Sequence, residues 1–144
     1  MSNATFSPPD LDVFYGLDGL GLTATGQRVE IDRAILDCRV LVADRWCHRC
    51  GRAGVPRGTV TRTIVHVPVG WRPTMLQVRV RRYRCADCRT VWRQDTTTAA
   101  AARTKLSRDA VYWALKCVVV DRMSIARVPG NLGTAWHTVN DAVL

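Results

Sequence analysis

The sequence predicts an α+β fold in which a small β-rich domain is followed by a domain of three helices. Two Cys-x2-Cys pairs enclose residues 51–84, and β-branched residues alternate with polar ones before and between them, as is typical of strands. After residue 107 the apolar residues recur at helical spacing. We therefore expect a loosely ordered segment at 1–27 with a short helix around Leu11 to Leu17, the β-rich domain at 28–94, a linker at 95–106 and the helical domain at 107–144.

Four cysteines are the strongest chemical signal in the chain. Cys47 and Cys50 form the first pair, and Cys85 and Cys88 form the second. Two such pairs can supply four thiolates to one tetrahedral zinc ion, which makes the β-rich domain a predicted zinc ribbon. Disulfides, a thioredoxin-like redox pair and incidental surface cysteines are the alternatives. Because the first residues lack the pattern of a signal peptide, we expect the cytoplasm, where thiols stay reduced.

The positive charge is concentrated on the same stretch. Residues 45–93 contain twelve Arg against Asp87 alone, within a chain of formal net charge +9. Arginine binds phosphate through two donors and stacks on bases, which favours a nucleic-acid surface over a merely solvated cationic face.

A β-hairpin is expected between the cysteine pairs. Residues 28–46 read as one long or two short strands, residues 59–70 as another, with a bulge or edge position at Pro68, and residues 73–85 as the clearest one. In this last strand the core face is formed by Leu76, Val78 and Val80. The opposite face presents Gln77, Arg79, Arg81 and Tyr83 as a cationic ladder.

Three helical segments follow. The first spans 108–121 with Ser107 as its N-cap, the second is short and passes through 125–128 after Ser124, and the third begins after a turn at Gly133. This is the outline of a helix-turn-helix, although a generic three-helix unit has the same pattern. Pro129 and Gly130 are expected to bend or shorten the second helix. Two further cysteines, Cys38 and Cys117, are expected in the core.

These motifs resemble the N-terminal part of a bacterial insertion-sequence transposase of the ISL-three family. The matching pieces are WCHRCG, VHVPVG, VRVRRYRCADC and DRMSIARV…NLGTAWHTVNDAVL. The resemblance implies a zinc ribbon and helix-turn-helix that recognise the terminal inverted repeats of a mobile element in DNA transposition. In that family a separate RNase-H-like domain performs catalysis with an Asp-Asp-Glu triad. That triad maps to none of Asp95, Asp109, Asp121 and Asp141, so we expect a DNA-binding fragment and no enzyme.

The expected partner is double-stranded DNA, with no membrane, and with a second copy or a full-length transposase as a further candidate partner. The fragment would be cytoplasmic and associated with the nucleoid. A regulatory or inert truncated transposase and a zinc-ribbon protein-interaction module remain alternative functions. Phosphates would be held by Arg79, Arg81, Arg82 and Arg84, with Arg49, Arg52 and Arg57 from the loops. Base edges would be contacted by Trp136, His137, Thr138 and Asn140.

Overall fold

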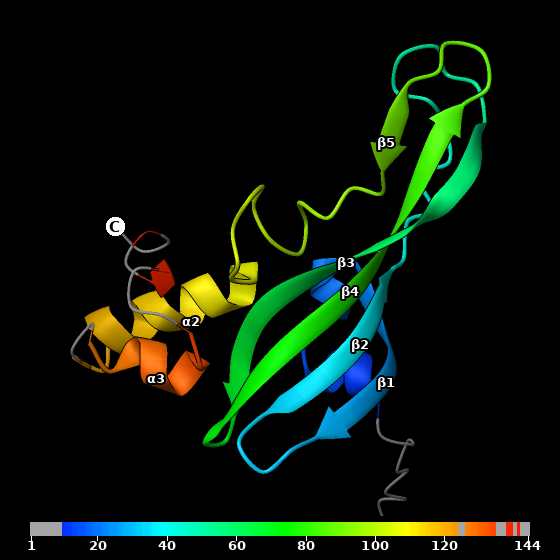
Figure 1. The fold of residues 1–144 in the computed structure, drawn as a ribbon. Coiled ribbons are helices and arrows are strands. Elements are labelled where there is room, and N and C mark those ends of the chain that lie inside the picture. Colours follow the sequence, from blue (N-terminus) through cyan, green and yellow to red (C-terminus); the bar gives the residue numbers. More distant parts are fainter. Residues whose placement is uncertain (1–9, 124–125, 135–137, 140, 142–144) are drawn as a thin grey trace, which may run out of the picture.

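The computed structural model describes residues 10–123, 126–134, 138–139 and 141. The chain is α+β, as predicted, and is dominated by one five-stranded sheet (Figure 1). Its elements in chain order are α1 (Leu11–Phe14), the 3-10 helix η1 (Asp18–Leu20), β1 (Leu22–Val29), β2 (Ala34–Val40), β3 (Gly54–Val69), β4 (Arg72–Cys85), β5 (Val91–Arg93), α2 (Arg108–Val119) and α3 (Val128–Leu132).

Strand β4 is the centre of the sheet. It pairs along its whole length with β3 as the predicted antiparallel hairpin, and the register shifts between His66 and Val69, as expected around Pro68. On its other edge, residues 74–79 pair in parallel with β2, whereas residues 82–84 pair with β5. The sheet therefore has two parts. A body contains β1, β2 and the adjoining halves of β3 and β4, and an arm comprises residues 44–60 and 80–93 (Figure 1).

The main core lies on one face of the body. Leu36, Leu76 and Val78 point into it from the strands, and Cys38 is buried there as predicted. We expected loose order over residues 1–27. From Asp10 onward this segment forms α1, where a short helix was expected, and then η1 and β1, because its leucines cover the apolar face of the sheet. The covering residues are Leu17, Leu20 and Leu22, together with Ala99 and Ala100 from the segment after β5.

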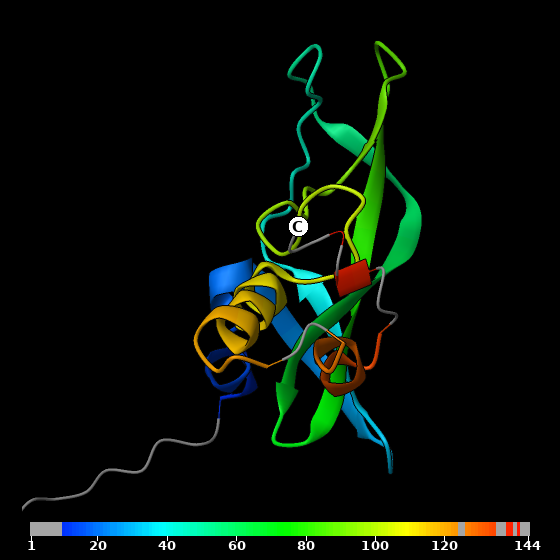
Figure 2. The ribbon, with the colours of Figure 1, turned by 90° about the vertical axis from the view of Figure 1, so that its left-hand side faces the viewer.

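A second core lies between the hairpin and the helices. Helix α2 begins where predicted, since the Ser107 side chain accepts a hydrogen bond from the Ala110 backbone N–H at 3.0 Å. The preceding residues run beside β3, where the Val65 N–H donates to the Lys105 carbonyl at 2.7 Å. Figure 2 looks onto α2 and α3 with the sheet behind them. Their shared core contains Val65, Leu106, Ala110, Ala114, Cys117, Val128, Leu132 and Val139.

The second helix differs in place from the prediction. Helix α3 begins at Val128, so Pro129 lies in its first turn, where a missing N–H breaks no helical hydrogen bond. Gly133 ends it with φ of 70°, as the turn pattern predicts. Ser124 lies outside the described residues. The described residues by themselves do not show a helix-turn-helix domain, which stays a prediction, as do the domain boundaries.

Candidate metal centre and nucleic-acid interface

The four cysteines of the two Cys-x2-Cys pairs meet at the far end of the arm. Cys47 and Cys50 lie in the loop between β2 and β3, Cys85 ends β4, and Cys88 lies in the turn before β5. Their Sγ atoms all lie within 4.8 Å of one another, with 3.5 Å between Cys47 and Cys88 and 3.3 Å between Cys50 and Cys85. A tetrahedral ion with Zn–S bonds of about 2.3 Å requires sulfur separations of about 3.8 Å. The donor set and its spacing therefore fit one zinc ion.

The two cysteine turns are built alike. In the first, the Gly51 N–H donates to the Cys47 carbonyl at 2.9 Å, and in the second the Arg89 N–H donates to the Cys85 carbonyl at 3.1 Å. Each turn closes on a residue in the left-handed region, with φ of 76° at Gly51 and 62° at Arg89. Glycine adopts this backbone freely, whereas arginine does so at an energetic penalty. Arg89 is thus held in place by the turn that presents Cys85 and Cys88.

The surroundings of the sulfurs favour the thiolate form at two of the ligands. Cys88 Sγ lies 3.1 Å from Thr90 Oγ1. The hydroxyl of Thr90 and, to a smaller extent, its backbone N–H lower the pKa of Cys88 to about 6. The Cys50 and Arg49 backbone N–H groups lower the pKa of Cys47. The Arg52 N–H also lowers the pKa of Cys50, but hydrogen bonding to Cys85 and burial outweigh it and raise that pKa to about 12. A metal ion must therefore displace a proton from Cys50.

Two aromatic residues form the interior of the arm beneath the cysteines. Tyr83 and Trp92 stack with 5.7 Å between ring centroids, and both pack against Cys47 and Cys85. The Trp92 indole N–H donates to the Asp44 carbonyl at 2.8 Å. We expected Tyr83 on the exposed cationic face, and this prediction was wrong, because its side chain is 1% exposed. The face on which Arg79 and Arg81 are exposed is covered further along, in the arm, by the cysteine loops.

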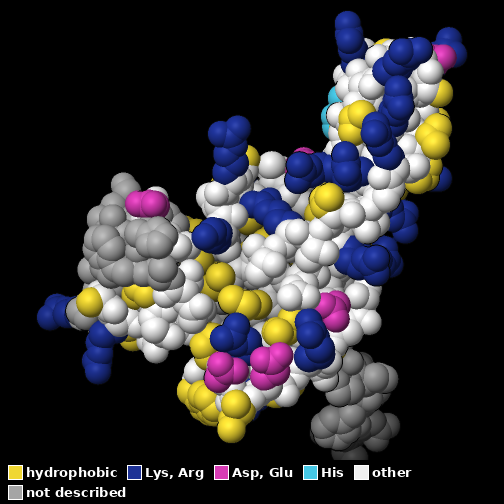
Figure 3. All heavy atoms as spheres, viewed as in Figure 1, with side chains coloured by type: hydrophobic (Ala, Val, Ile, Leu, Met, Phe, Trp, Pro, Cys, Tyr) yellow, Lys and Arg dark blue, Asp and Glu magenta, His cyan; other side chains and the backbone are white. Residues whose placement is uncertain are grey.

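The four predicted phosphate ligands of β4 lie on opposite faces of the strand. Successive side chains alternate, so Arg79 and Arg81 point to one face and Arg82 and Arg84 to the other. Arg79, Arg81 and Arg84 are exposed, and Arg82 is half-buried. Figure 3 shows Lys and Arg side chains spread along the arm and its junction with the body. The predicted phosphate ligands of β4 therefore form two sets, and only Arg79 and Arg81 belong to the predicted cationic ladder.

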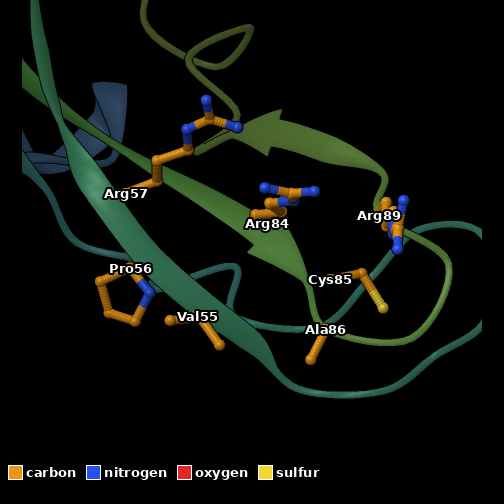
Figure 4. A pocket seen from close by; sticks show the side chains of 7 residues that line it. All are labelled: Val55, Pro56, Arg57, Arg84, Cys85, Ala86 and Arg89. Carbon is orange, nitrogen blue, oxygen red and sulfur yellow. The ribbon is translucent and has the colours of Figure 1, made fainter.

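Arg84 lines a hollow beside the metal centre together with two arginines from other elements. Figure 4 shows Arg57 from β3, Arg84 from β4 and Arg89 from the turn after Cys88 at this hollow, which has a volume of about 430 Å³. Arg89 was not among the residues that the sequence singled out. Its position in the second cysteine turn could have suggested it, since that turn lies next to Arg84.

The remaining predicted contacts have varied surroundings. Arg52 Nε lies 3.0 Å from Asp87 Oδ2 and so joins the two cysteine turns by an ion pair. His48, expected to face solvent or a phosphate, is exposed and lies 2.8 Å from Asp44 Oδ1. Thr138 is half-buried beside the buried Val139. Trp136, His137 and Asn140 lie outside the described residues.

Two Cys-x2-Cys turns that close a β-hairpin over a four-sulfur site define a zinc ribbon. Residues 44–88, about a third of the chain, match the family model described as the zinc-finger of transposase IS204/IS1001/IS1096/IS1165. The match supports the resemblance over the ribbon and, with the cysteine geometry, confirms the prediction of zinc. The matched model is a zinc ribbon and not a catalytic domain.

No curated protein and no solved structure matches the chain. Among the helices of the described residues, none has both the length and the apolar composition that crossing a bilayer requires.

Proposed function

We propose that this chain is the DNA-binding part of a transposase and that it recognises the terminal inverted repeats of a mobile element. The observation that carries the proposal is the position of the arginines. A zinc ribbon matching a transposase family holds the end of an arm, and residues 45–93 of that region contain twelve Arg against one acid. Such a cationic surface on a stiff support suits the phosphate backbone of a duplex.

Zinc has a structural role in this proposal. A tetrahedral site with four thiolate ligands has no open position for substrate, so the ion supplies cross-linking and no catalysis. Cys47, Cys50, Cys85 and Cys88 would hold it. By joining the loop before β3 to the end of β4, the site keeps the arm extended. The arginines on β4 are thereby presented at fixed spacing.

Sequence preference would come from the C-terminal helical segment. In this proposal it acts as a helix-turn-helix, with Trp136, His137, Thr138 and Asn140 reaching base edges in the major groove. Asparagine can hydrogen-bond adenine through two contacts. Arg79, Arg81, Arg82 and Arg84 would contact phosphates, which position the protein without reading sequence. Such a protein would act on the nucleoid in the cytoplasm, with a second copy or a full-length transposase as a partner.

Fluorescence anisotropy of the zinc-loaded chain with an inverted-repeat duplex and a scrambled duplex tests the proposal. With about six phosphates engaged, log affinity should fall with log salt concentration at a slope of about −5. Arg82→Gln should weaken both duplexes alike, and Asn140→Ala should reduce only the preference for the repeat. Absence of binding at low salt, or affinity that ignores salt, would contradict the proposal.

A further inference from the structure

We propose that Arg39, Arg79 and Arg81 form a pocket for a backbone phosphate of DNA, on the open face of the sheet where the body meets the arm. Arg39 lies outside the arginine-rich stretch in the sequence and outside the segment that matches the transposase family. The inference rests on the proposed DNA binding and specifies where one phosphate is held.

The strand register brings the three arginines together. Arg39 on β2 is the direct register partner of Arg79 on β4, and Thr61 on β3 is the partner of Arg79 on the other side. Arg81 follows two residues later on β4, opposite Thr59. Because neighbouring strands lie about 4.8 Å apart and side chains alternate, all five residues share one face.

Within the described part of the chain, the charges of this cluster are not neutralised by ion pairs. Among the described residues, no carboxylate lies within ion-pair distance of Arg39, Arg79 or Arg81. Asp12 accepts hydrogen bonds from Thr23 and Ala24, which lower its pKa, and the charge of Arg39 lowers it further from a longer distance. Asp37, on the same face, lies 4.0 Å from Arg28 instead. Like charges directly opposite each other on a sheet are destabilising. An anion bound between these guanidinium groups would remove that repulsion.

The three arginines line a hollow, one wall of which is fixed by hydrogen bonds. The hollow has a volume of about 350 Å³, and the side chain of Gln94 forms part of its lining. Gln94 is 4% exposed, and its amide accepts a hydrogen bond from the Arg81 N–H at 2.8 Å and donates to the Val42 carbonyl at 2.9 Å. These bonds hold β4 against the chain leaving β2, so the backbone positions of Arg39 and Arg81 are set before any ligand arrives.

A phosphate suits this hollow better than a carboxylate. Three guanidinium groups can donate to several oxygens at once, and a tetrahedral phosphate offers oxygens in more than one plane. The exposed hydroxyl of Thr59 adds a further donor at the rim. A duplex lying over the open face would place a phosphate at the junction of body and arm.

Arg39→Gln tests the pocket, with Arg33→Gln as the matched control. Arg33 is half-buried, its guanidinium already lies 3.3 Å from Asp32, and its loss changes the net charge equally. We expect Arg39→Gln to weaken duplex binding about 3- to 10-fold and to reduce the salt slope by about 1, and Arg33→Gln to leave both unchanged. Zinc content and circular dichroism establish that each variant is folded.

Double variants sharpen the test. Arg39→Gln combined with Arg79→Gln should be non-additive, because the two residues share one phosphate, whereas Arg39→Gln with Arg84→Gln should be additive. If the Arg39 and Arg33 variants bind the duplex with equal affinity while Arg82→Gln still weakens duplex binding, the proposed pocket is wrong and the proposed DNA binding stands. Failure of the unaltered chain to bind DNA would overturn both proposals.

Thermal unfolding in inorganic phosphate and in chloride at equal ionic strength separates a free anion from DNA. If phosphate stabilises the unaltered chain and not Arg39→Gln, while duplex affinity is the same for both, the pocket binds a free anion and the proposal is wrong. Loss of duplex affinity in Arg39→Gln supports it, whatever the phosphate result.

Discussion

The α-carbon of Gly54 lies against the indole of Trp92, so that a methyl group at this glycine would be 2.5 Å from Cη2 and 2.6 Å from Cζ2 of the ring. The first residue of β3 therefore packs on the aromatic interior of the arm without space for a side chain. The same methyl group would lie 3.0 Å from the Cβ of Tyr83. This contact ties the start of the hairpin to the metal centre.

Gly54→Ala should destabilise the zinc-loaded chain by about 1–3 kcal/mol, because the indole must move within a packed cluster. Gly130→Ala is the matched control. Gly130 lies in α3 with nothing within 4 Å of an added methyl group, so the same change should stabilise by up to about 1 kcal/mol. Thermal unfolding measures both. Equal effects of the two substitutions would show that the Gly54–Trp92 contact is not tight in solution.

Loss of zinc should unfold the arm and spare the body. Structural zinc contributes an apparent ~10–16 kcal/mol in small zinc domains, whereas the body has its own core of buried leucines and valines. Cys85→Ser should reduce the zinc content from about one ion per chain towards none. Cys117→Ala, in the helical core, should keep the ion.

Hydrogen exchange locates the unfolding. Amides around Tyr83 and Trp92 should lose protection after chelation, while those of Leu36 and Leu76 should keep it. Uniform loss of protection would mean that body and arm fold as one unit.

His66 should make stability depend on pH. Its Nε2 lies 2.6 Å from the Tyr15 carbonyl and must donate to it, so its Nδ1, 2.8 Å from Ser107 Oγ, accepts from that hydroxyl in the neutral ring. Burial lowers the pKa of His66 below its ordinary value. The imidazole of the unfolded chain therefore takes up a proton near pH 6.5, whereas that of the folded chain stays neutral at this pH. The stability that His66 contributes is complete above about pH 6.5 and is lost as the pH falls below it.

The comparison is between the unaltered chain and His66→Gln, each saturated with zinc, by urea unfolding at about pH 7.5 and about pH 5.5. The unaltered chain should lose more stability on acidification than the variant. Acid also protonates the cysteine ligands, but it does so in both proteins, so only the difference between them reports on His66. An identical pH dependence of the two proteins would therefore exclude His66 as its source.

Arg62 should matter for stability and not for DNA. Its guanidinium donates to Thr96 Oγ1 at 2.6 Å and to the carbonyls of Ala101 and Thr104 at 2.8 and 2.9 Å. Arg62→Met should therefore destabilise by about 2–4 kcal/mol, since several hydrogen bonds to a charged group are lost. Arg57→Met on the same strand, at an exposed position, should show the reverse: unchanged stability and weaker DNA binding. Urea unfolding measures stability and fluorescence anisotropy measures DNA affinity. If the two substitutions change both quantities in the same way, the separate roles of Arg62 and Arg57 are wrong.

Local patterns in the sequence were sufficient for several elements. The metal ligands followed from two cysteine pairs whose spacing forces a tight turn. Alternation of Leu76, Val78 and Val80 with polar residues predicted the core face of β4, and Ser107 marked the start of α2. Each of these depends on residues within a few positions of one another, so that no distant part of the chain is needed to interpret them.

Other features depend on long-range pairing. The parallel pairing of β2 with β4 places Arg39 beside Arg79, and the loops of the arm bury Tyr83, which its strand alone would have left exposed. The segment before β2 lacked a clear pattern, because its few leucines are ordered only by the face that they cover.

The sequence alone thus determined that four sulfurs would gather on a hairpin rich in arginine, because cysteine spacing and strand alternation act over short distances. Only the tertiary structure decided which arginines meet. One edge of β4 pairs with β2 along one part and with β5 along another. A shift of one residue in either pairing would turn every side chain of β2 or of β5 to the other face of the sheet.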